Sequence, residues 1–325
     1  MSWSEFIRES WEKAGDGRKV LGVKNLQDLW SGYGQIARLS FEGGSTMICK
    51  VIDPSGGGAH PRGWSGDRSH QRKVRSYEVE GHWYKKYEPL SDALWPKCYG
   101  QGEEGRAQLI WLEDLDAMGY GGRRSSLSEI EMESVLKWLG HFHGWSYGKS
   151  TEGLWPKGTY WHLETRPDEL QALEDKPLKA IAEILDQRLN DCPHRSLVHG
   201  DAKVANFCFH STENKVAAVD FQYIGGGVGV QDLVYFFGSC CREDILEELE
   251  GWVLECYFQH LRQSLRRYHP EVNPSEVEDS WRGLYDVAWT DFHRFLKGWS
   301  PSHWKLSSYS EMVKSRCVEK LKEES

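Results

Sequence analysis

The segment LVHGDAKVANF, residues 197–207, decides the fold of this sequence, together with VAAVDFQ at residues 216–222. Within these segments Asp201 precedes Asn206 by five residues, and Asp220 follows Asn206 after a further fourteen. Phosphoryl transfer demands a carboxylate beside the attacking hydroxyl, and oxygen ligands that hold magnesium against the phosphates of a nucleotide. Two aspartates and one asparagine are the side chains that such a site uses, so the pattern indicates a phosphotransferase.

The spacing explains how the three side chains can share a site. A five-residue step lets a loop turn back, so that the carboxylate of Asp201 faces an acceptor hydroxyl while the amide oxygen of Asn206 faces a metal ion. Asp220 lies at the end of an apolar stretch and can reach the same ion, and Mg²⁺ prefers hard oxygen ligands. We therefore predict Asp201 as the catalytic base, and Asn206 and Asp220 as Mg²⁺ ligands. Singly, each residue could instead lie in a polar turn or cap a strand, but their common register favours the site.

Two neighbours of Asp201 complete the predicted catalytic group. Lys203 lies two residues further on, where an ammonium can neutralise the phosphoryl group in transfer. His199 lies two residues earlier, and we expect it to brace the loop by hydrogen bonding. Proton transfer by His199 is the alternative, but Asp201 is the better-placed proton acceptor.

The segment from His199 to Asn206, followed by Asp220 and Phe221, resembles the aminoglycoside phosphotransferase and choline-kinase-like group of proteins. The Asp-Phe-Gln at residues 220–222 and LEDL at residues 112–115 are similar to the ecdysteroid-kinase-like branch. The resemblance covers most of the chain in order. It implies a protein-kinase-like fold that uses ATP and Mg²⁺ to phosphorylate a hydroxyl of a small-molecule acceptor.

The periodicity of the first third predicts an antiparallel sheet. Residues 35–41, 46–52 and 106–113 alternate apolar and polar side chains between Gly-rich breaks. Residues 69–87 carry apolar residues at helical spacing and predict one helix packed with that sheet. We expect residues 1–115 to form the smaller, nucleotide-binding lobe of an α+β fold.

The remaining chain, residues 116–325, changes to long helical periodicities and predicts the larger, mainly helical lobe with the catalytic loop and the acceptor site. Two short apolar stretches inside it, residues 196–198 and 215–221, are typical of strands that present loops. The three glycines at residues 225–227 predict a local turn. The predicted helices span residues 127–145, 169–189, 243–267, 275–297 and 310–322.

A glycine turn in the first lobe is a candidate phosphate contact. The segment SGYGQ places Ser31, Gly32 and Gly34 before a predicted strand, where a turn without side chains can approach phosphates closely. An ordinary hairpin turn is the alternative interpretation. Alone, the turn favours a hairpin, and only together with the downstream catalytic segment is a phosphate contact equally favoured.

A lysine in the middle of a predicted strand is a second candidate nucleotide contact. Lys50 in TMICKVI stands where a lysine reaches the α- and β-phosphates of ATP. Glu80 in the following helix is its expected ion-pair partner, and Glu78 competes for that role. A lysine on the exposed edge of a sheet is the alternative for Lys50.

The segment RAQLIWLEDL, residues 106–115, fits a strand that runs into the connection between the lobes. Exposed backbone groups around Trp111, Leu112 and Glu113 could bind adenine there. A core strand that ends in an acidic turn is the plainer interpretation, and both can hold together.

Composition excludes several classes of protein. The net charge is −9 and the 40 Lys and Arg residues are scattered, so broad neutralisation of nucleic-acid phosphates is not expected. No window reaches the 18 or so apolar residues that span a bilayer, and residues 1–19 lack the apolar core of a signal peptide. Eight cysteines without metal-ligand spacing favour reduced thiols, hence a cytoplasmic location. Oligomeric state does not follow from the sequence.

The kind of acceptor follows from what lies after Asp220. Asp232 follows only twelve positions later, and no Ala-Pro-Glu sequence follows, so there is little room for the activation segment of a protein kinase. A small-molecule acceptor is therefore favoured.

The aromatic residues of the last helices could cage a cationic acceptor, but helical spacing favours a core role for most of them: Trp281, Tyr285, Trp289 and Phe292.

A protein without activity is the competing hypothesis. A nucleotide-binding pseudokinase could use its open and closed forms to engage a partner. Loss of any of the four central residues would favour it, and all four are present: Lys50, Asp201, Asn206 and Asp220.

Overall fold

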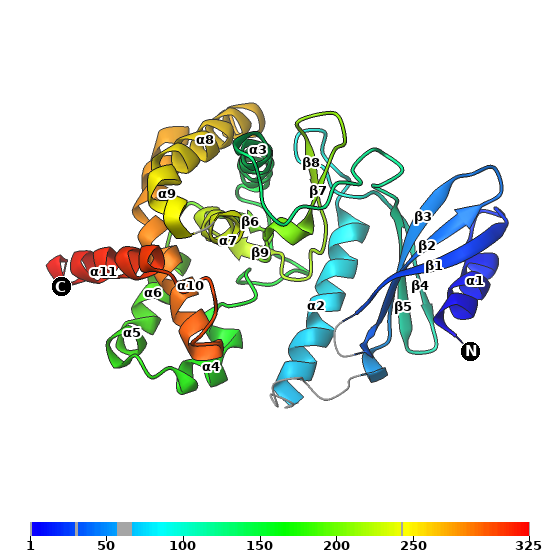
Figure 1. Ribbon diagram of the computed structural model, residues 1–325, viewed down its shortest axis with the longest axis horizontal. Helices are drawn as coiled ribbons and strands as arrows, with labels where there is room; N and C mark the ends of the chain where they lie inside the picture. Colours follow the sequence, from blue (N-terminus) through cyan, green and yellow to red (C-terminus); the bar gives the residue numbers. More distant parts are fainter. Residues whose placement is uncertain (1, 30–31, 57–66, 242, 325) are drawn as a thin grey trace.

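The computed structural model describes residues 2–29, 32–56, 67–241 and 243–324. Its first part is a five-stranded antiparallel sheet, with a helix on each face (Figure 1). Helix α1 (Trp3–Ala14) covers the outer face, and α2 (Asp67–Lys86) lies between the sheet and the helical part of the chain. In spatial order, the strands are β1 (Val20–Asp28), β2 (Gly34–Phe41), β3 (Thr46–Ile52), β5 (Ala107–Glu113) and β4 (Cys98–Glu104).

The three strands predicted from alternation are the three central ones, and the predicted helix is α2. Sequence reasoning missed β1 and β4. Both are edge strands, and their sequences, VLGVKNLQD and CYGQGEE, carry polar residues and glycines where the alternation would need apolar side chains. An edge strand buries less of its surface, so it needs less of the hydrophobic pattern that marks a strand.

The second part of the chain is mainly helical, as predicted. Helices α3 (Glu129–Ser146) and α8 (Glu243–Tyr268) pack along each other, and α10 (Tyr285–Trp299) contacts both α7 (Val230–Cys240) and α11 (Ser308–Glu323). The predicted core role of the aromatic residues on the last helices is confirmed. Each side chain is at most 2% exposed: Trp281, Tyr285, Trp289 and Phe292.

Two predicted long helices are broken. The stretch at residues 169–189 forms three short helices instead of one, because Asp175 caps a new helix and Pro177 occupies its first turn. The stretch at residues 275–297 forms two helices that divide after Gly283, a residue that favours a helix end. The short helices are α4 (Pro167–Ala172), α5 (Lys176–Ala180), α6 (Ala182–Asn190) and α9 (Pro274–Gly283).

Two short strand pairs flank the loops that carry Asp201 and Asp220. Strand β6 (Ser196–Val198) pairs with β9 (Gly225–Gly227), and β7 (Phe207–Phe209) pairs with β8 (Val216–Ala218). The prediction of a local turn at the three glycines was therefore wrong. Glycine has a low strand propensity, and only pairing with a segment distant in sequence reveals this strand.

All eight cysteines lie in the described ranges, and none of them forms a disulfide. In the same ranges, no helix is both long and apolar enough to cross a membrane.

Candidate active site

A cleft of about 590 Å³ opens between the sheet and the helical part. Apolar side chains of the sheet form part of its wall, including Ile36, Ile48 and Leu112. Charged and polar side chains from both parts of the chain form another part. Among them are six of the predicted site residues: Lys50, Glu80, Glu113, Lys203, Asn206 and Asp220.

The structure pairs Lys50 with Glu80. The Nζ atom of Lys50, on β3, lies 2.6 Å from Oε2 of Glu80, on α2, and both side chains are at most 5% exposed. Glu78, the competing residue, is exposed and pairs with Arg75 instead. Burial opposes the charge of Lys50, but the carboxylates of Glu80 and Asp220 raise its pKa. Lys50 therefore keeps its positive charge at the wall of the cleft.

Replacing Lys50 with methionine should lower the free energy of unfolding by about 3 kcal/mol, because a buried carboxylate loses its partner. Urea denaturation at neutral pH measures the loss. The double variant Lys50→Met/Glu80→Leu should recover most of it, whereas Lys50→Met/Glu78→Leu, altered on the exposed face of the same helix, should not. Equal stability of the two double variants would contradict the buried ion pair.

Asp201 is buried at the centre of the catalytic segment. Its Oδ2 atom accepts hydrogen bonds from Nζ of Lys203 at 2.9 Å and from Nδ2 of Asn206 at 3.0 Å. Burial opposes the charge of Lys203, but Asp201 and Asp220 raise its pKa. The Asp201 carboxylate is therefore held by two side chains that line the cleft, although it does not line the cleft itself.

Two oxygens remain available for a cation in this cleft. Nδ2 of Asn206 donates to Asp201, and within the described ranges no contact is seen for its Oδ1. Asp220 uses Oδ1 to contact Nζ of Lys50 at 3.4 Å, and its carboxylate is 35% exposed. One amide oxygen and one carboxylate at the same cleft are hard ligands, and they fit Mg²⁺.

The backbone of Asp220 is strained, with a φ of 70°. Such an angle is uncommon for a residue with a side chain, and it concentrates at functional sites. Burial opposes ionisation of Asp220, but the charges of Lys50, Lys73 and Lys203 hold its pKa below the usual value. The next residue, Phe221, is fully buried and stacks on Trp83 of α2 at 4.8 Å between ring centroids. The aromatic core thus fixes the strained aspartate.

His199 braces the loop, as the sequence led us to expect. Its side chain is fully buried, and Nε2 lies 3.0 Å from the carbonyl oxygen of Val219. Its Nδ1 atom accepts from the backbone N–H of Asp201 at 3.3 Å. Both ring nitrogens are therefore engaged by backbone groups, which links the segments that carry Asp201 and Asp220 and leaves no nitrogen for proton transfer.

Asp232 of α7 holds the same loop through its backbone N–H groups, and sequence reasoning missed this role. Its fully buried carboxylate accepts from the backbone N–H groups of His199 at 2.5 Å and Gly200 at 2.9 Å. His143 of α3 lies 3.0 Å away through Nε2. A single aspartate at the start of a helix resembles an ordinary cap in sequence, so only the fold reveals it.

Gly200 is required where it stands. Its φ is 80°, and a Cβ atom there would lie 2.2 Å from the carbonyl oxygen of Tyr223. Any side chain would therefore displace the loop just before Asp201.

The structure separates the residues predicted for adenine binding. Leu112 and Glu113 line the cleft. Trp111 does not, because its side chain points to the opposite face of the sheet and packs on Trp11 at 5.2 Å between ring centroids. Its backbone also pairs with strands on both sides, at Cys49 and Gly100.

The glycine turn connects β1 and β2. Gly32 is exposed, and Gly34 opens β2 opposite Ile52, where a Cβ atom would lie 2.1 Å from the carbonyl oxygen of Val51. Close packing of two strands accounts for Gly34, and neither glycine lines the cleft. Ser31 lies outside the described residues.

Three further ionisable residues interact electrostatically with Asp201, and sequence reasoning missed them. The Asp201 carboxylate raises the pKa of Tyr160 and of Tyr235, in each case after burial, which is the larger cause. It also acts on Lys305, which precedes α11. None of the three lines the cleft that contains Lys50 and Asp220. No motif marks them, because they come from a loop, a helix and a second loop far apart in sequence.

Comparisons with known proteins bear on the family and on the fold of this chain. A model of the ecdysteroid kinase-like family matches residues 70–152 and 156–269. No curated protein matches the sequence. Among solved structures, choline kinase from Cryptosporidium parvum Iowa II is 12% identical, with a TM-score of 0.52, over 98% of this chain and 94% of that chain. Macrolide 2'-phosphotransferase MphH from Brachybacterium faecium is 12% identical, with a TM-score of 0.51, over 94% and 96%.

These likenesses confirm the predicted α+β, protein-kinase-like fold. The family match contains the whole catalytic segment, from His199 to Asp220, and also Glu80.

Proposed function

Since this chain belongs to the ecdysteroid kinase-like family, we propose that it transfers the γ-phosphoryl group of ATP to a hydroxyl of a small molecule. One observation carries the proposal. The buried carboxylate of Asp201 is held by Lys203 and Asn206, which line a cleft that Lys50 also lines. A proton acceptor and cations for phosphates thus share one site. The solved structures are named for choline and macrolide acceptors, and both kinds of alcohol belong in a search for the acceptor.

In the proposed reaction the hydroxyl oxygen of the acceptor forms a bond to the γ-phosphorus as the bond from that phosphorus to the leaving oxygen of ADP breaks. Asp201 orients the hydroxyl and takes its proton. Lys203, whose ammonium contacts Asp201, offsets the negative charge of the phosphoryl group in transfer. His199 and Asp232 keep the loop in place.

We assign residues 1–115 to the nucleotide-binding lobe and residues 116–325 to the catalytic and acceptor lobe. Lys50, positioned by Glu80, would contact the α- and β-phosphates. Leu112 and Glu113 would lie against adenine at the wall of the cleft.

Asn206 and Asp220 are the residues that would hold Mg²⁺. Bound there, the ion would neutralise the negative charge of the nucleotide phosphates. Asp220 is suited to this role because three lysines keep it ionised.

The test is ADP release from ATP across a panel of hydroxylated metabolites, amino alcohols, macrolides and aminoglycosides. We expect at least one acceptor to stimulate release, EDTA to abolish the stimulation, and added Mg²⁺ to restore it. The same reaction without acceptor is the control for slow hydrolysis. Nucleotide binding without stimulation by any acceptor would instead support a pseudokinase that engages a partner.

A further inference from the structure

The loop between α10 and α11 places a lysine on an aromatic surface that includes Tyr235 of α7, the helix that also contacts the catalytic loop through Ser239 and the backbone N–H of Val204. Nζ of Lys305 lies 4.2 Å from the centroid of the Tyr235 ring, and 5.6 and 5.5 Å from those of Phe292 and Trp304. An ammonium within about 6 Å of a ring centroid is attracted by the ring face. The face of Tyr235, a residue that interacts with Asp201, is therefore already occupied by a cation of the protein itself.

The surroundings of this ammonium oppose its charge more than they support it. Within the described ranges Lys305 forms no ion pair, and Asp201 is the largest influence that favours its charge. Burial lowers the pKa of Lys305 to about 8, so the charged form is stabilised less than that of an exposed lysine. A partly buried amine without an ion-pair partner has hydrogen-bond donors that an oxygen atom of a ligand would satisfy.

Hydrogen bonds fix the loop that carries Lys305. The hydroxyl of Ser307 caps α11 and forms a capping box with Ser310. The hydroxyl of Ser310 contacts Nδ1 of the buried His293 at 3.1 Å, and the backbone N–H of Ser308 donates to Glu243 at 2.7 Å. These contacts come from two different helices, α10 and α8.

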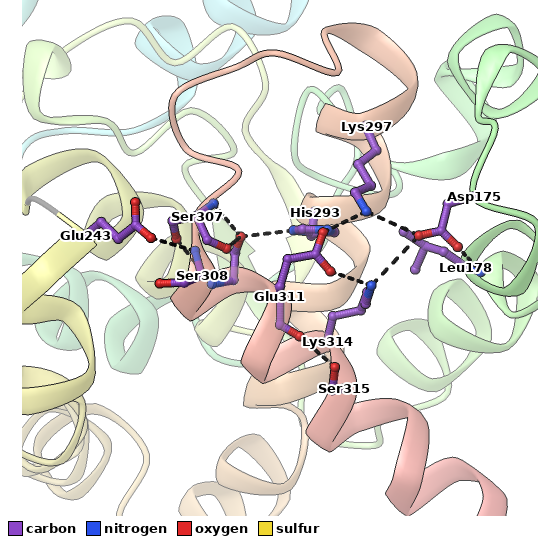
Figure 2. A network of polar contacts seen from close by, with 11 residues as sticks. Asp175, Leu178, Glu243, His293, Lys297, Ser307, Ser308, Glu311, Lys314 and Ser315 are labelled. Carbon is purple, nitrogen blue, oxygen red and sulfur yellow. Dashed lines mark hydrogen bonds and ion pairs between the residues drawn. The ribbon is translucent and has the colours of Figure 1, made fainter.

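Ion pairs hold the same helix start from the other side. Figure 2 shows Glu311 facing both Lys297 of α10 and Lys314, and Asp175 facing the same two lysines. The Glu311 carboxylate lies 2.7 Å from Nζ of Lys297. The position of Lys305 therefore follows from a fixed helix start rather than from a free loop.

Lys305 lies on the side of Asp201 that carries Tyr160 and Tyr235. It rests on the Tyr235 ring, whose centroid is 5.5 Å from that of Tyr160, and the backbone N–H of Tyr160 donates to the carbonyl oxygen of Gly200 at 3.1 Å. Burial and the charge of Asp201 both raise the pKa of Tyr235, on which Lys305 rests. Neither Tyr235 nor Lys305 lines the nucleotide cleft. In the proposed function, the acceptor must approach Asp201 from that side, since the nucleotide occupies the other.

Resting on the proposed function, we infer that Lys305 selects the acceptor by charge. It excludes amino alcohols, because a second cation would meet both an occupied aromatic face and a like charge in a site of low dielectric. It favours hydroxylated molecules without a positive charge, which bring a carboxylate, carbonyl or hydroxyl oxygen to its ammonium. The acceptor is thus a neutral or anionic alcohol.

The experiment compares kcat/KM for three sets of alcohols matched in size: hydroxy acids, neutral alcohols and amino alcohols. In the unaltered protein, kcat/KM for hydroxy acids and for neutral alcohols should exceed kcat/KM for amino alcohols by about 10-fold or more. Lys305→Met should narrow this ratio by about 10-fold, mainly through KM, and Lys305→Glu should reverse it. Lys322→Met, an exposed lysine of α11, should keep the original ratio.

Each result decides the question. A preference for amino alcohols, or a ratio that Lys305→Met leaves unchanged, overturns charge selection by Lys305 while the kinase function stands. Absence of turnover with every alcohol overturns the proposed function, and charge selection with it. Narrowing in Lys305→Met with reversal in Lys305→Glu supports the inference.

Discussion

Replacing Asp201 with asparagine should lower kcat by about 10²- to 10⁴-fold, the usual range for loss of a general base. The amide has nearly the shape of the carboxylate, but it cannot take the proton of the acceptor hydroxyl. One of its two positions is still an oxygen that can accept from Lys203 or Asn206, so the loop should stay folded. Acceptor-stimulated ADP release measures the loss, and unfolding temperature shows that the structure persists.

Nucleotide affinity should change little in the same variant, because Lys50 and Asp220 line the cleft and Asp201 does not. Quenching of tryptophan fluorescence by ATP can follow this binding. Asp191→Asn, at an exposed aspartate that ends α6, is the matched control and should keep full activity. Turnover by Asp201→Asn within about 3-fold of the control would remove Asp201 from the role of general base.

The sequence predicts those elements of the fold that bury a regular apolar pattern. The central strands alternate because both neighbours and both faces constrain them, whereas β1 and β4 have free edges and carry little pattern. Helix breaks were missed for a different reason. The stretch that became α9 and α10 keeps its aromatic spacing across Gly283, so the periodicity continues although the helix does not.

The site residues also fall into those that a local sequence pattern predicts and those that it does not. Local spacing is enough to predict that Asp201, Asn206 and Lys203 lie together, and the order of motifs along the chain is enough to pair Lys50 with Glu80. Lys305 and Asp232 carry no such signal. Each reaches the catalytic segment only through tertiary packing, and each is a single residue without a motif around it.

Replacing Asp232 with alanine should lower the free energy of unfolding by about 3 kcal/mol or more, because two buried backbone N–H groups and His143 lose their acceptor. Activity should fall as well, by about 10²-fold, since a loop displaced by about 1 Å no longer presents Asp201 correctly. Thermal unfolding and ADP release measure the two effects separately.

The two effects can be told apart with a second buried aspartate of the same lobe. Asp286 of α10 is 4% exposed and pairs with Arg316 at 2.6 Å and Lys320 at 2.6 Å. Asp286→Ala should therefore lose stability without loss of kcat per folded molecule, because none of these partners belongs to the catalytic segment. Asp232→Ala should lose both. If the two variants lost stability alone and kept equal kcat, Asp232 would be a structural residue of the core and not the support that positions Asp201.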